Sequence, residues 1–300
     1  MKDKRLRFRV IDGLLIAMMI LPLVAAMVLN ILTTPASEGI SITGALVYFT
    51  IPMPLMDLPI TEAQVNTWLV MITILGACLF LTHGIREGRG GVRQMAAEWI
   101  VEKLDGLVGD NMDPVFHFSY SPFVGAILAL SAFSSLMSLL GVYPPTSDLN
   151  VVAGWGILVF ILITKNKLKA GVGYYLKGFA EPIPVMLPMN IISEVATPVS
   201  MSFRHFGNVL SGSVISALVA WALQSASAAL LGWLPGFLGE IPFLQIGIPA
   251  ILSAYFDVFS GCIQAFIFAM LTMLYISGGY PGEELASRET RRKEKAAMAR

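Results

Sequence analysis

One basic side chain of this sequence lies inside a long apolar run, where a charge needs a partner or a path for water. Arg204 stands within residues 188–212, PMNIISEVATPVSMSFRHFGNVLSG. The other 19 of the 20 Lys and Arg residues fall in four polar segments, at 1–9, 86–103, 165–177 and 288–300. A cation in the hydrocarbon layer costs roughly 3 kcal/mol on insertion scales, so its presence predicts a functional site. The structural alternative is an Arg204 that only pairs with a neighbouring carboxylate.

Further polar side chains recur at helical spacing around Arg204. Steps of three or four residues place one set on a single helical face: Glu194, Thr197, Met201, Arg204, Asn208 and Ser211. The same run contains Asn190 and Ser213, and the last apolar run, AILSAYFDVFSGCIQAFIFAML, carries Asp257, Gly261 and Gln264. Polar groups at this spacing should face protein or water rather than acyl chains.

An arginine and an aspartate inside the membrane predict either an ion route or a buried salt bridge. An ion route needs further polar groups, which Asn190, Glu194, Asn208, Ser211, Ser213 and Gln264 supply. A direct Arg204–Asp257 pair is the alternative. His205 is about 100° around the helix from Arg204, so we expect it to face elsewhere. None of the three histidines is predicted to bind a metal.

The composition is that of an integral membrane protein. Hydrophobic residues make up 56% of the chain and charged residues 13%, with a mean hydropathy of +0.73, whereas soluble domains carry about 25% charged residues. The net charge of zero argues against a nucleic-acid partner. Cys78 and Cys262, both in apolar runs, suggest small buried residues rather than disulfides or a zinc site. Since there is no phosphate-binding loop, metal motif or nucleophile triad, we expect no cofactor and no catalysis by this chain alone.

Six apolar stretches are long enough to cross a bilayer, which predicts an all-α polytopic fold. They cover about 11–33, 65–84, 121–142, 149–164, 186–224 and 246–278. Six crossings place all four basic segments on one side, as the positive-inside rule requires, so both termini should be cytoplasmic. The outer loops, about 34–64, 143–148 and 225–245, contain no Lys or Arg.

The last two stretches are too long for upright spans. A helix from Pro188 to about Gln224 would measure roughly 55 Å against a hydrocarbon core of about 30 Å, which predicts strong tilt in both helices. Pro198 and Pro249 are the expected positions of bends. In 92–108 the apolar residues recur with a period of 3.6, which predicts an amphipathic helix on the cytoplasmic membrane surface.

The polar runs resemble a known family, subunit a of the F-type ATP synthases. PVSMSFRHFGNVLSG is similar to its signature, usually PxSLSxRLFGNxxAG, and SGCIQAFIFAMLTMLYI is similar to its closing helix, GxxQAxIFxxLxxxYI. MSLLGVYPPTSDLN resembles its outer hairpin, and WIVEKLDGLVGDNM its surface helix. The resemblance covers about 65–278. It divides the chain into an extra span and outer loop at 1–64, an ion-translocating domain at 65–278 and a basic tail at 279–300.

The resemblance implies a stator subunit in a bacterial plasma membrane, with a c-subunit ring, a b-subunit peripheral stalk and the other ATP synthase subunits as partners. Arg204, at the position of the family's essential arginine, would face a ring carboxylate between two aqueous half-channels. Asn208 and Gln264 match family positions near the arginine, and Glu194 lies close to an acidic position on the cytoplasmic side. The transported ion would be a proton or sodium.

Three positions depart from the family pattern. Ser213 stands where many bacterial members carry Glu, and Asp257 where many carry His. We hypothesise that the two changes compensate and that Asp257 is the titrating relay of the outer half-channel. His205 replaces the usual Leu. A secondary transporter and a scaffold protein are the rival functions, but the sequence contains no internal repeat of the kind that transporters show.

Overall fold

The computed structural model describes residues 2–33, 44–54, 56–85, 90–114, 116–231, 243–245, 247–282 and 285–286. Most of the predicted basic tail and parts of the outer loops at 34–64 and 225–245 lie outside these residues. The main helices are α1 (Lys2–Thr33), α2 (Glu62–Thr82), α3 (Val92–Asn111), α4 (His117–Leu136), α5 (Leu149–Lys167), α6 (Val172–Phe179), α7 (Leu187–Leu231), α9 (Ile248–Ser253) and α10 (Gly261–Gly278). A π-helix, η6 (Ala254–Ser260), joins α9 to α10. Short 3-10 helices are η1 (Met137–Leu140), η2 (Pro145–Ser147), η3 (Leu168–Ala170), η4 (Pro184–Met186) and η5 (Phe243–Gln245).

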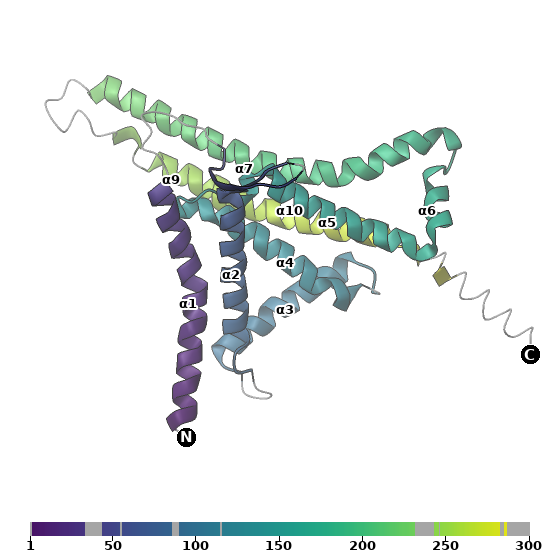
Figure 1. The fold of residues 1–300 in the computed structure, drawn as a ribbon, viewed down its shortest axis with the longest axis horizontal. Helices are drawn as coiled ribbons and strands as arrows, with labels where there is room; N and C mark the ends of the chain where they lie inside the picture. The colour runs from purple at the N-terminus through teal and green to yellow at the C-terminus, as the bar shows by residue number, and fades with distance from the viewer. Residues whose placement is uncertain are drawn as a thin grey trace, which may run out of the picture.

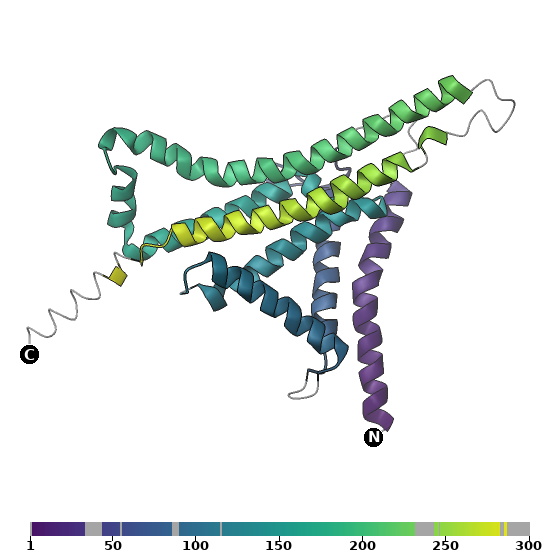
Figure 2. The same ribbon diagram turned by 180° about the vertical axis from the view of Figure 1, so that it is seen from behind.

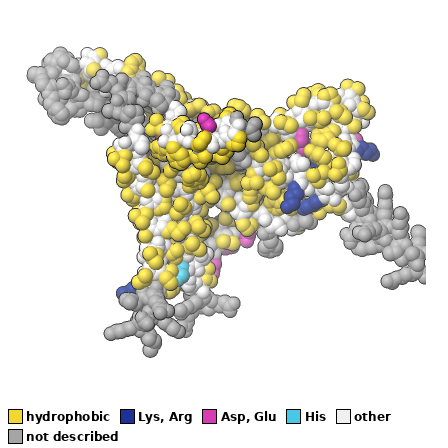
Figure 3. Space-filling view, viewed as in Figure 1, with side chains coloured by type: hydrophobic (Ala, Val, Ile, Leu, Met, Phe, Trp, Pro, Cys, Tyr) yellow, Lys and Arg dark blue, Asp and Glu magenta, His cyan; other side chains and the backbone are white. Residues whose placement is uncertain are grey.

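The six predicted spans are confirmed among the described residues. Helices long and apolar enough to cross a membrane cover Phe8–Thr33, Glu62–Thr82, Ser119–Leu140, Leu149–Ala170, Pro184–Leu231 and Ile248–Gly278. The space-filling view is mostly hydrophobic, and its few Lys and Arg side chains lie at the N-terminal end of α1 and near α6 (Figure 3). The chain is therefore a multi-pass membrane protein.

The helices form two groups with different directions. α1 and α2 lie side by side, whereas α5, α7 and α10 run across them (Figures 1 and 2). The ends of α5 and α10 and the start of α7 gather around α6, and we call this the α6 end. The end of α4, the start of α5 and the end of α7 lie towards α9, and we call this the α9 end. Strong tilt relative to the membrane stays a prediction.

The main core lies around α10. Its residues Phe268, Ala269, Met273 and Ile276 are at most 1% exposed and pack against α3, α4, α5 and α7. α7, by contrast, is mostly exposed on the outside of the bundle. Because α7 is apolar as well as exposed, its outer face must meet lipid or another protein in the membrane.

α7 is one helix of 45 residues, about 67 Å long, and it extends past the predicted end at 224. Pro198 lies inside α7 without ending it. Pro249 stands in the first turn of α9, where its missing N–H has no helical partner to lose, and a bend at this proline stays a prediction. The irregular part of the last span is the π-helix η6, eight residues further on at Asp257.

Two smaller features differ from the expectation. The outer loop contains an antiparallel hairpin of β1 (Val47–Ile51) and β2 (Leu58–Thr61), whose backbone leads directly into α2. Cys78 and Cys262 are exposed rather than buried, because their sides of α2 and α10 point away from the bundle. The predicted surface helix exists as α3 and exposes Val92, Met95 and Trp99, but its place on the membrane surface stays a prediction.

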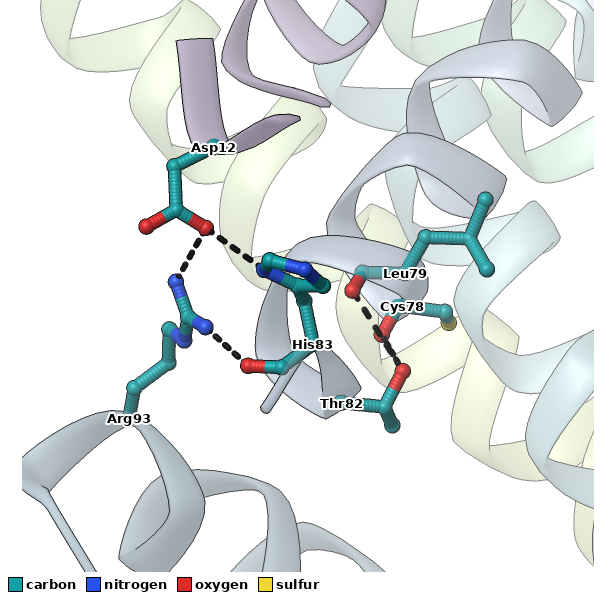
Figure 4. A network of polar contacts seen from close by, with 6 residues as sticks. All are labelled: Asp12, Cys78, Leu79, Thr82, His83 and Arg93. Carbon is teal, nitrogen blue, oxygen red and sulfur yellow. Dashed lines mark hydrogen bonds and ion pairs between the residues drawn. The ribbon is translucent and has the colours of Figure 1, made fainter. Parts of the chain in front are cut away.

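α1 is fixed to α2 and α3 by a polar network beside the first turn after α2. Asp12 accepts a hydrogen bond from Arg93 at 2.9 Å and lies 2.9 Å from His83 Nδ1, while Arg93 also donates to the His83 carbonyl (Figure 4). The Phe8 ring stacks on His83, with 4.5 Å between the centroids. These contacts position a helix that lies ahead of the region resembling the family.

Candidate functional site: polar residues of the last two spans

α7 packs antiparallel to the last span in a register that two contacts define. Asn208 Nδ2 donates to Ser260 Oγ at 2.8 Å, and a Cβ added to Gly212 would lie 3.1 Å from Phe256 Cβ. Because the two helices are antiparallel, each residue further along α7 lies level with one residue earlier in the last span. Arg204 lies at the level of Gln264, and Ser211 at the level of Asp257.

Arg204 points out of the bundle. Its side chain is exposed, and so are those of its neighbours Phe203, at 54%, and Val199, at 46%. Arg204 forms no ion pair with any residue that the structure describes. The guanidinium thus stands on an apolar outer face, where lipid alone would leave it unpaired.

The alternative of an Arg204–Asp257 salt bridge is not formed. The register separates Asp257 from the level of Arg204 by seven residues, which is about 10 Å along the helix. Asp257 is half-buried in the middle of η6, and its Oδ2 accepts a hydrogen bond from Ser253 Oγ at 2.6 Å. Single π-turns within helices occur often at functional sites. Asp257 is therefore held by Ser253 of its own helix and not by the arginine.

Of the other polar residues, Gln264 lies between the two helices, whereas Ser211 and Ser213 bond to the backbone of α7. Gln264 is 6% exposed and lies between the helices, close to the Asn208–Ser260 contact. Ser211 donates to the Gly207 carbonyl, and Ser213 donates to the Leu210 carbonyl at 2.9 Å, so both hydroxyls bond to their own helix. No hydrogen bond joins Ser213 to Asp257 in the described part, and compensation between them stays a hypothesis.

A polar cavity of about 640 Å³ opens at the α6 end. α5, α6, α7 and the end of α10 line it, and α7 contributes Asn190, Glu194 and Thr197 from one face. Its innermost residue on α7, Thr197, lies seven residues from Arg204, again about 10 Å. The predicted polar face of α7 therefore runs from this cavity to the arginine.

Two of the predicted residues line this cavity with defined partners. Glu194 is paired with Lys167 of α5, whose Nζ lies 2.5 Å from Oε2, and the Tyr175 hydroxyl of α6 lies 3.5 Å from Oε1. Asn190 Nδ2 donates to the carbonyls of Phe179 and Glu181, at 2.9 and 3.1 Å, and so holds the turn that leads into α7.

Sequence reasoning missed Lys167 and the setting of His205. Lys167 was counted only as one of the basic residues that set orientation, although a lysine in the last turn of a span can reach a carboxylate on a neighbouring helix. His205 faces away from Arg204, as predicted, and is fully buried with Nε2 3.2 Å from Ser131 Oγ. Its neighbours Trp155 and Phe268 come from α5 and α10, so no local signal could have identified them.

Comparison with known proteins identifies this arrangement. The sequence model of the family described as ATP synthase A chain matches residues 64–277, which is more than half of the chain. The chain belongs to the ATP synthase A chain family. "ATP synthase subunit a" of Legionella pneumophila (strain Paris) is 28% identical over 236 residues, which cover 77% of this chain and 91% of the relative. "ATP synthase subunit a, sodium ion specific" of Propionigenium modestum is 30% identical over 237 residues, covering 73% and 74%.

Membership of the ATP synthase A chain family assigns the chain to the ion-transporting membrane part of an ATP synthase, a complex of several subunits. The matched region contains all of the candidate residues described above, Arg204 and Asp257 among them. α1 precedes it.

Proposed function

We propose that the chain is the stator subunit that couples ion flow to rotation of a c-subunit ring, with Arg204 facing the ring. The observation that carries this proposal is an exposed guanidinium, unpaired among the described residues, on an apolar outer face of α7. A cation in this position needs water or an acidic partner outside the chain. Ring carboxylates that pass α7 one after another at mid-membrane would provide it.

The chemistry of arginine suits this role. A guanidinium keeps its proton under essentially all conditions. Next to a carboxyl group it favours the ionised form, so a ring carboxylate that approaches Arg204 would release its proton. A fixed positive charge also blocks direct passage of a cation between two half-channels. The ion must then travel around with the ring, and this converts the ion gradient into rotation.

The polar residues lie on two sides of Arg204, and this supports a separate access route from each side of the membrane. The cavity at the α6 end, with Asn190 and Glu194 in its wall, would be the cytoplasmic half-channel. Asp257, nearer the α9 end, would be the titrating group of the outer half-channel, with Ser211 and Ser213 on the facing helix and with Asn208 and Gln264 orienting water near the arginine. The transmembrane potential contributes about 2.3 kcal/mol per charge per 100 mV.

The setting follows from the same proposal. The chain would act in a bacterial plasma membrane with both termini in the cytoplasm, beside the c ring and the b-subunit stalk, and would not itself be catalytic. The ion is a proton or sodium. One relative carries "sodium ion specific" in its printed name, which supports keeping sodium beside the proton in this proposal.

The test is Arg204→Ala in the complete ATP synthase, reconstituted in vesicles. We expect ATP formation driven by an ion gradient to be abolished, while ATP hydrolysis by the catalytic part continues. Arg9→Ala, which removes an exposed arginine at the end of α1, is the matched control and should keep full activity. ATP formation at the normal rate with Arg204→Ala would refute the proposal.

A further inference from the structure

The wall of the cavity at the α6 end contains a cation that the ion route itself does not require. Lys167 extends from the last turn of α5 to Glu194, with 2.5 Å between Nζ and Oε2. The two side chains are 31% and 14% exposed, so the pair is partly shielded from bulk water. In this setting the ammonium cancels most of the field that Glu194 would otherwise produce in the cavity.

The other described side chains that line the cavity add no unpaired charge to it. The second lining carboxylate, Glu181, is paired with Lys177 at 3.6 Å on the exposed rim. The Tyr175 hydroxyl lies 3.5 Å from Oε1 of Glu194, the oxygen that Lys167 does not bond. Burial, and after it the charge of Glu194, raises the pKa of Tyr175 above the ordinary tyrosine value, so this hydroxyl keeps its proton at neutral pH. α10 contributes only neutral side chains to the lining, Leu274 and Tyr275 among them.

We propose that Lys167 is a positioning residue that sets ion discrimination in this cavity, by holding Glu194 in a compensated pair that a sodium ion cannot use as a ligand. The inference rests on the proposed function. Sodium needs carboxylate or carbonyl oxygens that are free to approach it, and it cannot displace a bound ammonium without leaving that charge unpaired. A proton moves between water molecules and needs no such site, so the compensated pair lets protons leave and does not retain sodium.

The test uses the complete complex in inside-out vesicles, where the cytoplasmic side faces the medium. ATP-driven proton pumping is measured while NaCl replaces choline chloride at constant ionic strength. We expect Lys167→Met to lose about two- to fivefold in rate as sodium rises, the size expected for one partly exposed ion pair. The unmodified complex and the rim control Lys177→Met should not respond to sodium.

Two further variants separate this role from a structural one. Lys167→Arg keeps the charge and should restore insensitivity to sodium. Lys167→Met combined with Glu194→Gln removes the carboxylate that sodium would bind, so it should also be insensitive. If Lys167→Met fails to assemble, the same measurement on Lys167→Gln replaces it.

Three results would overturn the inference: an insensitive Lys167→Met, a double variant that still responds to sodium, or an unmodified complex that does. They leave the proposed function standing as long as Arg204→Ala remains inactive. ATP formation by Arg204→Ala would instead refute the proposed function itself, so the two failures are distinguishable.

Discussion

Asn208 Nδ2 and Ser260 Oγ lie 2.8 Å apart and fix the register between α7 and the last span. Together with the close approach of Gly212 to Phe256, this contact sets which residues of the two helices lie level. The register places Arg204 level with Gln264. Asp257 then lies about 10 Å further along the contact between the helices, next to Phe256, which closely approaches Gly212. A different register by one turn would bring the arginine and the aspartate towards each other.

The register predicts a specific disulfide. Asn208→Cys with Ser260→Cys, in a chain whose Cys78 and Cys262 are replaced by Ser, should form a cross-link in membranes under mild oxidation. Arg204→Cys with Asp257→Cys should not, because their levels differ by about 10 Å and a disulfide needs Cα atoms within about 7 Å. Gel mobility with and without reductant measures both yields. The reverse pattern would show that the helices pair in another register.

Asp257→Asn tests the relay in the outer half-channel. The amide has the same shape and can keep the contact with Ser253, but it cannot take up and release a proton. We expect ATP-driven proton pumping to fall by tenfold or more, on the order of the 10²–10⁴ that acid–base groups contribute. Ser253→Ala, which removes the hydrogen bond and keeps the carboxylate, should lose far less. Full pumping by Asp257→Asn would eliminate the relay role.

Apolar length and charge placement were enough to predict the spans, because both are local. An uninterrupted run of about 20 apolar residues has few other stable states in a bilayer. The same holds for the outward direction of Arg204 relative to His205, since neighbouring residues on a helix point about 100° apart. These parts of the fold could be predicted from the lengths of the apolar runs, the placement of charged residues and the helical period.

The missed features all depend on contacts between distant segments. The π-helix at Asp257 is followed by Gly261, where an added Cβ would lie 2.6 Å from Ser135 Cβ of α4, so the shape of the last span depends on how closely it approaches α4. The Lys167–Glu194 pair exists because α5 and α7 converge at the α6 end. No local pattern encodes either approach.

Gly76→Val tests whether α1 is an integral part of the fold. A Cβ on Gly76 would lie 3.1 Å from the backbone of Met18 and Met19, so a branched side chain would force α1 away from α2. We expect a loss of about 1–3 kcal/mol, as for overpacking in a core, measured as a lower temperature of dissociation of the complex in mild detergent. Gly13→Val on α1, where nothing lies within 4 Å, is the matched control and should leave that temperature unchanged. Equal temperatures for both variants would mean that α1 is not held against α2.

His205 predicts a stability effect that can be separated from ion transport. The ring is fully buried, with Nε2 3.2 Å from Ser131 Oγ and with Phe268 edge-on at 5.6 Å between centroids. His205→Ala removes the ring and leaves a void among α4, α5, α7 and α10, which should cost about 2–4 kcal/mol.

Two companion variants make this prediction sharp. Ser131→Ala removes only one interhelical hydrogen bond and should cost about 0.6 kcal/mol, the average for such bonds in membranes. His205→Leu refills the space with an apolar side chain but leaves the buried Ser131 hydroxyl without its partner, Nε2 of His205, so it should cost more than Ser131→Ala. Denaturation in SDS, followed by loss of the assembled complex, should therefore rank the variants Ser131→Ala, His205→Leu and His205→Ala in order of increasing damage. If His205→Ala were as stable as Ser131→Ala, the histidine would not be a packing residue, and its position next to Arg204 would need a different physical reason.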